Sequence, residues 1–136
     1  MNLRRQYVQA KTALDVGSRK KPYLWIHDFD QVVLPYMLEQ MTRRLPGNML
    51  CHEGLLKLQE QDKKNSTEYM QTLKVYLEQH LSATQSAKEL FIHRSTFLYR
   101  IEKIKEILQS ELLDPDEIFY LELSFRLLEQ EEEKGE

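Results

Sequence analysis

Residues 87–104 (AKELFIHRSTFLYRIEKI) bring together the side chains of this chain that are best suited to recognise another molecule. Their apolar positions are spaced as in two short helices joined by a tight turn, with Ala87 at the close approach and Phe97 and Ile101 packing back against the first helix. This spacing predicts that polar side chains occupy the turn, the outward face and the start of the first helix. They are Thr84, Gln85, His93, Arg94, Ser95, Thr96, Tyr99, Arg100 and Lys103.

These residue types suit double-stranded DNA. Arginine pairs with O6 and N7 of guanine through two hydrogen bonds, and Ser, Thr and His reach bases or phosphates. Lys103 and Tyr99 suit phosphates, which orient a helix without reading sequence. The pattern therefore predicts a helix-turn-helix that binds DNA. The alternative is a helical protein-interaction module whose basic face, residues 84–105, binds an acidic partner.

The net charge of −3 is unevenly distributed along the chain. The last eight residues hold five acids and one lysine, whereas residues 84–105 hold five bases and two acids. The first 21 residues hold six bases and one acid. This distribution permits a nucleic-acid partner but does not by itself identify one.

Other arrangements of reactive residues point away from an enzyme, a cofactor or a metal. Cys51, His52 and Glu53 are adjacent on one expected helix and point in different directions, which disfavours a shared ion. The chain has no glycine-rich phosphate loop, no HExxH and no nucleophile elbow. A single cysteine, no apolar signal segment and no membrane-spanning stretch predict a cytoplasmic location.

The chain resembles the C-terminal domain of the sugar-diacid and purine-catabolism regulators, the CdaR/PucR-like family. That family's pattern is TL…YL, a short gap, then A…L.(V/I)HRNTL.YR(L/I)..I. The matching residues here are Thr72-Leu73, Tyr76-Leu77, Ala87, Leu90, Ile92-His93-Arg94-Ser95-Thr96-Phe97, Tyr99-Arg100-Ile101 and Ile104. Two positions depart from the pattern: Ser95 replaces the usual Asn, which removes an amide able to read adenine, and Phe97 replaces the usual Leu.

The resemblance also covers the first half of the chain. Residues 10–17 (AKTALDVG) followed by YLWIHDF resemble the end of the family's middle domain, which has a nucleotide-cyclase-like fold. Leu55, Leu58 and Asp62 resemble its linking segment. The resemblance implies a bacterial transcription regulator that acts as a homodimer or higher oligomer. It also implies a small-molecule effector that binds an N-terminal sensory region missing from this chain.

Helix and strand signals place these residues on expected elements. A first helix is expected to end at Gly17, a strand at residues 23–27, and a helix from Pro35 in its first turn to Arg44. Shorter helices are expected at residues 53–61 and 67–80, with a polar loop at 62–66 between them. Ser82 has the form of a capping residue for the helix that ends near Phe91.

The remaining elements complete the expected architecture. Residues 93–96 form the turn, a longer helix runs to Leu108, and Asp114-Pro115 starts the last helix. The fold class is thus mainly α: a helix-turn-helix DNA-binding domain at 67–130, preceded by a helical linker at 35–66. Residues 1–34 are expected to be a helix–strand remnant of a truncated domain, with linker, and residues 131–136 a frayed acidic tail.

Overall fold

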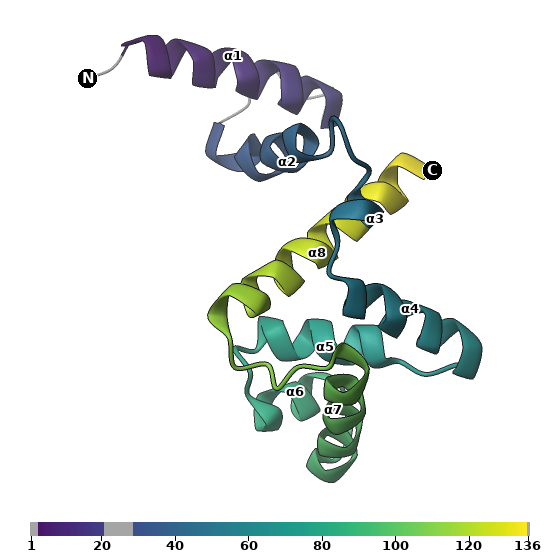
Figure 1. The fold of residues 1–136 in the computed structure, drawn as a ribbon. Coiled ribbons are helices and arrows are strands. Elements are labelled where there is room, and N and C mark those ends of the chain that lie inside the picture. Colours follow the sequence, from purple (N-terminus) through teal and green to yellow (C-terminus); the bar gives the residue numbers. More distant parts are fainter. Residues whose placement is uncertain (1–2, 21–28, 136) are drawn as a thin grey trace. The chain divides into compact units, whose positions relative to one another are not determined.

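The computed structural model describes residues 3–20 and 29–135, and every regular element in these ranges is a helix. The mainly α prediction is therefore confirmed. The strand expected at residues 23–27 lies outside the described residues. The chain divides into two compact units, Met1–Pro46 and Gly47–Glu136. Figure 1 shows the helices in chain order.

The first unit consists of α1 (Leu3–Lys20) and α2 (Phe29–Met41), which pack against each other. Their contact buries Ala13 and Val32, with Phe29 and Tyr36 packed around them. Burial of these apolar side chains away from water stabilises the contact between α1 and α2.

Three predicted helix boundaries in the first unit are wrong. α1 continues through Gly17 to Lys20, so this glycine does not end the helix. Pro35 lies in the interior of α2 rather than in its first turn, and α2 ends at Met41. Both residues cost helical stability, but neither forbids a helix. In α2, burial of Val32 and Leu38 on either side of the proline offsets that cost.

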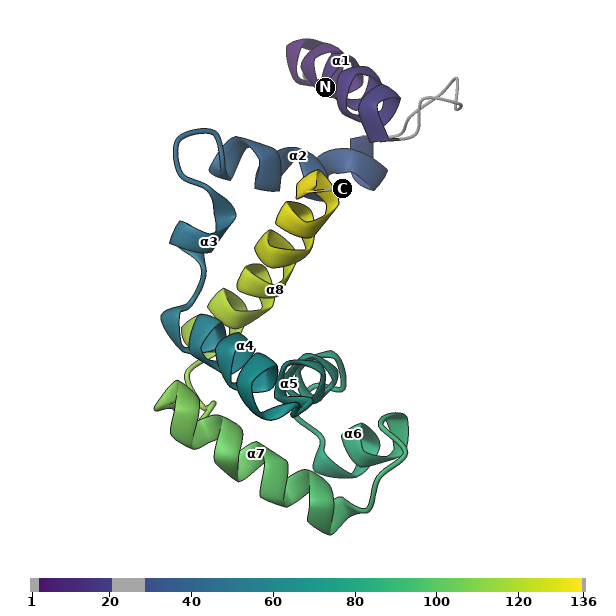
Figure 2. The ribbon, with the colours of Figure 1, turned by 90° about the vertical axis from the view of Figure 1, so that its right-hand side faces the viewer.

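The second unit contains six helices in the described residues. They are α3 (Gly47–Leu50), α4 (Glu53–Asn65), α5 (Tyr69–Glu78), α6 (Ala83–Glu89), α7 (Arg94–Leu108) and α8 (Pro115–Gly135). Its core contains Leu55, Leu58, Leu73, Phe97, Ile104 and Leu121, all fully buried. Figure 2 shows α7 lying along α4, α5 and α6, each of which contacts it.

The helix α4 extends beyond its predicted end and joins the core of this unit. It runs to Asn65, so the polar loop expected at residues 62–66 is wrong and the connection to α5 is shorter. The Asp62 carboxylate accepts hydrogen bonds from the Tyr69 N–H at 2.9 Å, the Met70 N–H at 2.8 Å and the Thr67 hydroxyl. A carboxylate in α4 therefore caps the N-terminus of α5, which holds α4 helical through that position.

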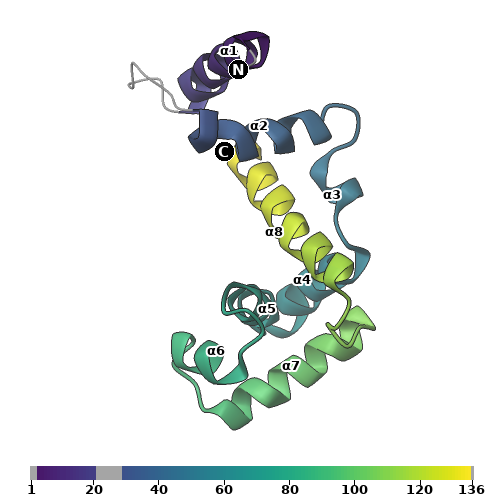
Figure 3. The same cartoon turned by 90° about the vertical axis from the view of Figure 1, so that its left-hand side faces the viewer.

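The last helix is longer than predicted at its C-terminus. The Asp114 carboxylate accepts from the Asp116 N–H at 3.0 Å, which confirms the predicted start. Residues 131–135 are helical rather than frayed, because Leu127, Leu128 and Gln130 are buried before them. The Glu131 carboxylate also accepts from the Asn48 N–H at 3.0 Å, which links this end of α8 to α3. The two helices contact each other, and Figure 3 shows their ribbons as neighbours.

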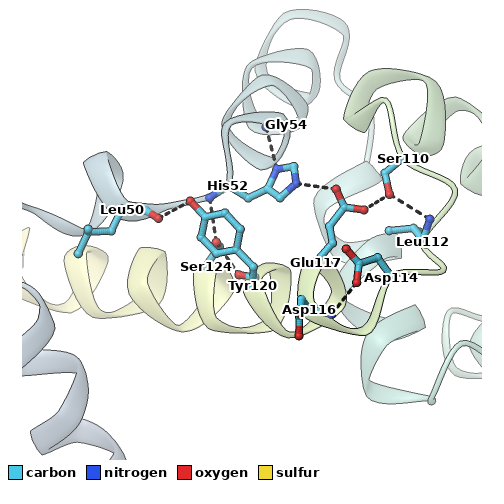
Figure 4. A network of polar contacts seen from close by, with 10 residues as sticks. All are labelled: Leu50, His52, Gly54, Ser110, Leu112, Asp114, Asp116, Glu117, Tyr120 and Ser124. Atoms are coloured by element: carbon cyan, nitrogen blue, oxygen red, sulfur yellow. Dashed lines mark hydrogen bonds and ion pairs between the residues drawn. The ribbon is translucent and has the colours of Figure 1, made fainter.

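A polar network joins α4, α8 and the segment between α7 and α8 (Figure 4). His52 Nδ1 accepts from the Gly54 N–H at 3.0 Å, so Nε2 carries the proton donated to Glu117 at 3.2 Å. Glu117 also accepts from the Ser110 hydroxyl. The Ser110 hydrogen bond, followed by the bond from His52, lowers the pKa of Glu117, so its carboxylate stays ionised in this half-buried position.

Candidate nucleic-acid interface

The first helix of the predicted motif begins and ends as its sequence indicates. The Ser82 hydroxyl accepts from the Gln85 N–H at 3.2 Å and caps α6. At the other end, the Ile92 N–H donates to the Ala87 carbonyl at 3.0 Å and the Phe91 N–H donates to the Lys88 carbonyl at 3.2 Å. These two bonds form a Schellman motif, which ends α6 and reverses the chain toward α7.

The Schellman motif places Phe91 in a strained conformation. Its φ is +57°, in the left-handed region that glycine adopts without steric cost. Its side chain is also 94% exposed, so packing against the described residues does not explain why a phenylalanine occupies this position. Phe91 therefore stands at the tip of the turn as an unpacked aromatic residue.

The helix α7 has one buried and one exposed face. Phe97, Ile101, Ile104 and Leu108 are buried, as their spacing predicts. The polar residues at the start of α7 are exposed to solvent. They are His93, Arg94, Ser95, Thr96 and Tyr99. Five of the nine predicted site residues thus lie together, from the cap of α7 through its second turn.

The N-terminus of α7 has backbone groups available to a ligand. His93 is the N-cap residue, but its side chain makes no capping hydrogen bond, and the first turn contains no acid. The first N–H groups of a helix point out of its end and carry partial positive charge. This end of α7 is therefore suited to an anion such as a phosphate, beside the exposed Arg94.

Arg100 lies elsewhere. It comes six positions after Arg94 in the chain, so the two side chains point about 120° apart around a helix. The Arg100 guanidinium donates to the Thr72 hydroxyl at 3.3 Å and lies 3.8 Å from the Glu68 carboxylate. Only 24% of the Arg100 side chain is exposed to solvent. The structure thus turns Arg100 toward α5, away from the outward position that the sequence analysis expected.

Comparison with known proteins shows what the segment that contains α6 and α7 is similar to. Residues 69–127, which span α5 to the middle of α8, match the PucR C-terminal helix-turn-helix domain. This segment is therefore similar to a PucR-type helix-turn-helix domain. The resemblance stated from the sequence is therefore confirmed. No solved structure matches the chain significantly.

The relatives with functional names are regulators. The chain is 30% identical over 123 residues, 89% of its length, to the purine catabolism regulatory protein of Bacillus subtilis. It is 27% identical over 129 residues, 95% of its length, to the carbohydrate diacid regulator of Escherichia coli. It spans only 22% and 33% of these two proteins. As predicted, the relatives with functional names are transcription regulators and not enzymes.

The second half of the outward face of α7 carries charges of both signs. Lys103 lies 3.7 Å from Glu106 and Lys105 lies 3.7 Å from Glu102, all on α7. The Lys103 ammonium also lies 5.7 Å from the centroid of the Tyr99 ring. A surface without acidic side chains is thus limited to the first two turns of α7.

On α6, Thr84 and Gln85 are exposed in the first turn, where the sequence analysis placed them. The hydrogen bond that caps α6 uses the backbone N–H of Gln85 and not its side chain. Sequence reasoning missed the contact of Thr72 with Arg100. The only signal was that both belong to the resemblance pattern, which does not say that they meet.

Other chemical sites are not found in the described residues. No three potential metal ligands cluster there, and no helix there is long and apolar enough to cross a membrane. Cys51 is buried, and burial, followed by the Glu131 charge, raises the pKa of its thiol to about 11. A thiol held protonated in this way is a poor nucleophile, so Cys51 acts as a small apolar core residue.

Proposed function

We propose that this chain binds double-stranded DNA sequence-specifically, as the DNA-binding part of a bacterial transcription regulator. The observation that carries the proposal is the exposed polar surface at the start of α7, within a segment that matches a helix-turn-helix domain. We define the recognition surface as Thr84, Gln85, His93, Arg94, Ser95, Thr96 and Tyr99. In this proposal Arg94 reads a base, and the N–H groups at the start of α7 hold a phosphate.

Two further proposals concern the whole regulator. One helix-turn-helix makes few base contacts, so we infer that two copies bind two half-sites, roughly 34–36 Å apart, as a homodimer or higher oligomer. We also infer that a small-molecule effector acts through an N-terminal sensory region outside these 136 residues. The support is that the regulators matched by this chain are much longer than the stretch it covers.

The test begins by selecting preferred sequences from a pool of random duplexes with the full chain. The selected duplex and a random one are then titrated at two salt concentrations. We expect tighter binding to the selected duplex, and affinity for both that falls as salt rises. Arg94→Ala should weaken specific binding by about 1–3 kcal/mol. Lys105→Ala, which removes a base beside Glu102 on the same helix, is the matched control.

The protein-interaction alternative makes a different prediction. It requires a basic face along residues 84–105, but Lys103 and Lys105 lie close to acids of the same helix. If the chain selects no duplex and binds none at low salt, while an acidic protein does bind it, the alternative replaces the DNA-binding proposal.

A further inference from the structure

A polar contact in the interior links α7 to α5. Thr72 is fully buried, and its hydroxyl donates to the Glu68 carbonyl at 2.8 Å. The same oxygen accepts from Arg100 Nη1 at 3.3 Å. Because the hydroxyl proton is committed to Glu68, the lone pairs of the oxygen are directed toward the guanidinium.

We propose that Arg100 is a positioning residue, which fixes the rotation of α7 about its own axis through Thr72. The recognition surface then meets DNA at one angle. This inference rests on the proposed function. It also gives a physical reason why two separate parts of the resemblance pattern, the Thr of TL and the Arg of YR, occur together in this chain.

The apolar packing of α7 does not by itself fix the rotation of this helix. Phe97 and Ile101 bury apolar surface against the core, and such contacts have little directional preference. A hydrogen bond weakens steeply when its angle changes. Arg100 also lies between exposed Tyr99 and buried Ile101 in the chain, at the edge of the buried face. A rotation of α7 about its axis therefore changes the length and angle of the bond between Arg100 and Thr72.

The same geometry disfavours a direct DNA contact by Arg100. Its Nη1 is engaged by Thr72, and only 24% of the side chain is exposed. The Thr72 bond uses only one of the five N–H donors of the guanidinium, so the low exposure of the side chain is what disfavours bidentate pairing with guanine. The Glu68 carboxylate, 3.8 Å from Nη1, would also repel an approaching phosphate.

The experiment uses the full chain with the selected and random duplexes described above. The variants are Thr72→Val, which removes the acceptor, Arg100→Lys, which keeps the charge but loses the fork, and the pair combined. Thr72→Ser keeps the hydroxyl and serves as the rescue. Glu68→Gln is a matched control, because its ion pair is long and its side chain is 75% exposed. Urea unfolding reports the stability of each variant.

We expect Thr72→Val and Arg100→Lys each to weaken binding to the selected duplex about tenfold. Binding to the random duplex, and the slope of affinity against salt, should stay near those of the parent. The double variant should be no weaker than either single variant. Thr72→Ser and Glu68→Gln should bind as the parent does.

Three outcomes would overturn the inference. If Arg100→Lys weakens binding while Thr72→Val does not, Arg100 contacts DNA directly. If both variants lose stability but keep the parent's preference for the selected duplex, the contact is structural only, and Arg100→Lys decides this even if Thr72→Val fails to fold. If the parent itself selects no duplex, the proposed function fails, and the positioning role fails with it.

Discussion

The first turns of α5 and α7 differ in what binds their backbone N–H groups. At α5, the Asp62 carboxylate accepts from two backbone N–H groups and one hydroxyl. At α7, His93 makes no side-chain capping bond and no acid follows in the first turn. Because an uncapped helix end costs stability, this difference supports the proposal that the first turn of α7 binds a ligand, whereas the first turn of α5 is satisfied within the protein.

The α8 helix resembles α5 in this respect. Its first turn contains Asp116 and Glu117, and Asp114 caps it. Carboxylates thus complement the helix dipole at α5 and α8 and are absent at α7, which lies between them in the chain.

The largest effect is expected for Asp62→Ala. The variant leaves the N–H groups of Tyr69 and Met70 without their partner, and should lower the free energy of unfolding by roughly 2–3 kcal/mol. Urea unfolding followed by circular dichroism measures this loss. Asp62→Asn keeps one acceptor oxygen and should lose less. An unchanged midpoint for Asp62→Ala would mean that the α5 cap contributes little.

Glu117→Gln should have the next largest effect, about 1–2 kcal/mol at neutral pH. The Ser110 and His52 hydrogen bonds lower the pKa of Glu117 in the folded protein. Its contribution to the free energy of unfolding is therefore complete above the pKa that Glu117 has in the unfolded chain, and it is lost as the pH falls through the lower pKa of the folded state. The parent should therefore lose stability on acidification, and the variant should lose less. Melting temperatures at neutral and acidic pH measure this. Equal losses in both proteins would contradict it.

Phe91→Gly should stabilise the protein by about 0.5–1 kcal/mol, because glycine relieves the positive φ of this residue. The exposed ring is not packed, so its removal costs little. Phe91→Ala is the control: it removes the ring but keeps the strain, and should show no gain. A loss of stability in the glycine variant would show that the ring does pack in solution.

The smallest effect on stability is expected for His93→Ser, which supplies the cap that α7 lacks. The backbone of His93 is already extended, as a capping residue requires, so a gain of about 0.5 kcal/mol is expected. The new hydroxyl should compete with phosphate for the same N–H groups and weaken DNA binding. His93→Ala removes the imidazole without a cap. If the serine variant binds DNA as well as the alanine variant does, the open N-terminus has no role in binding.

Local sequence signals predicted the helix-turn-helix well, but the turn expected at residues 93–96 is wrong, because α6 ends at Glu89 and α7 already begins at Arg94. The Ser82 cap, the Asp114-Pro115 start and the buried spacing of α7 all depend on residues within a few positions of one another. The predicted helix ends were wrong where contacts between residues far apart in the chain determine the end of a helix. The polar residues 62–65 continue α4 because Asp62 caps α5, and residues 131–135 continue α8 beyond a buried stretch that ends at Gln130.

The sequence by itself determined that the chain is mainly helical, where α6 and α7 lie, and which side chains line the start of α7. Periodicity and capping residues carry that information because helices form through contacts between residues three and four apart. Only the tertiary structure decided which of the two arginines faces outward. Arg94 is exposed, whereas Arg100 bonds to Thr72, 28 residues earlier in the chain. No local pattern encodes that contact, because it exists only once α5 and α7 have packed together.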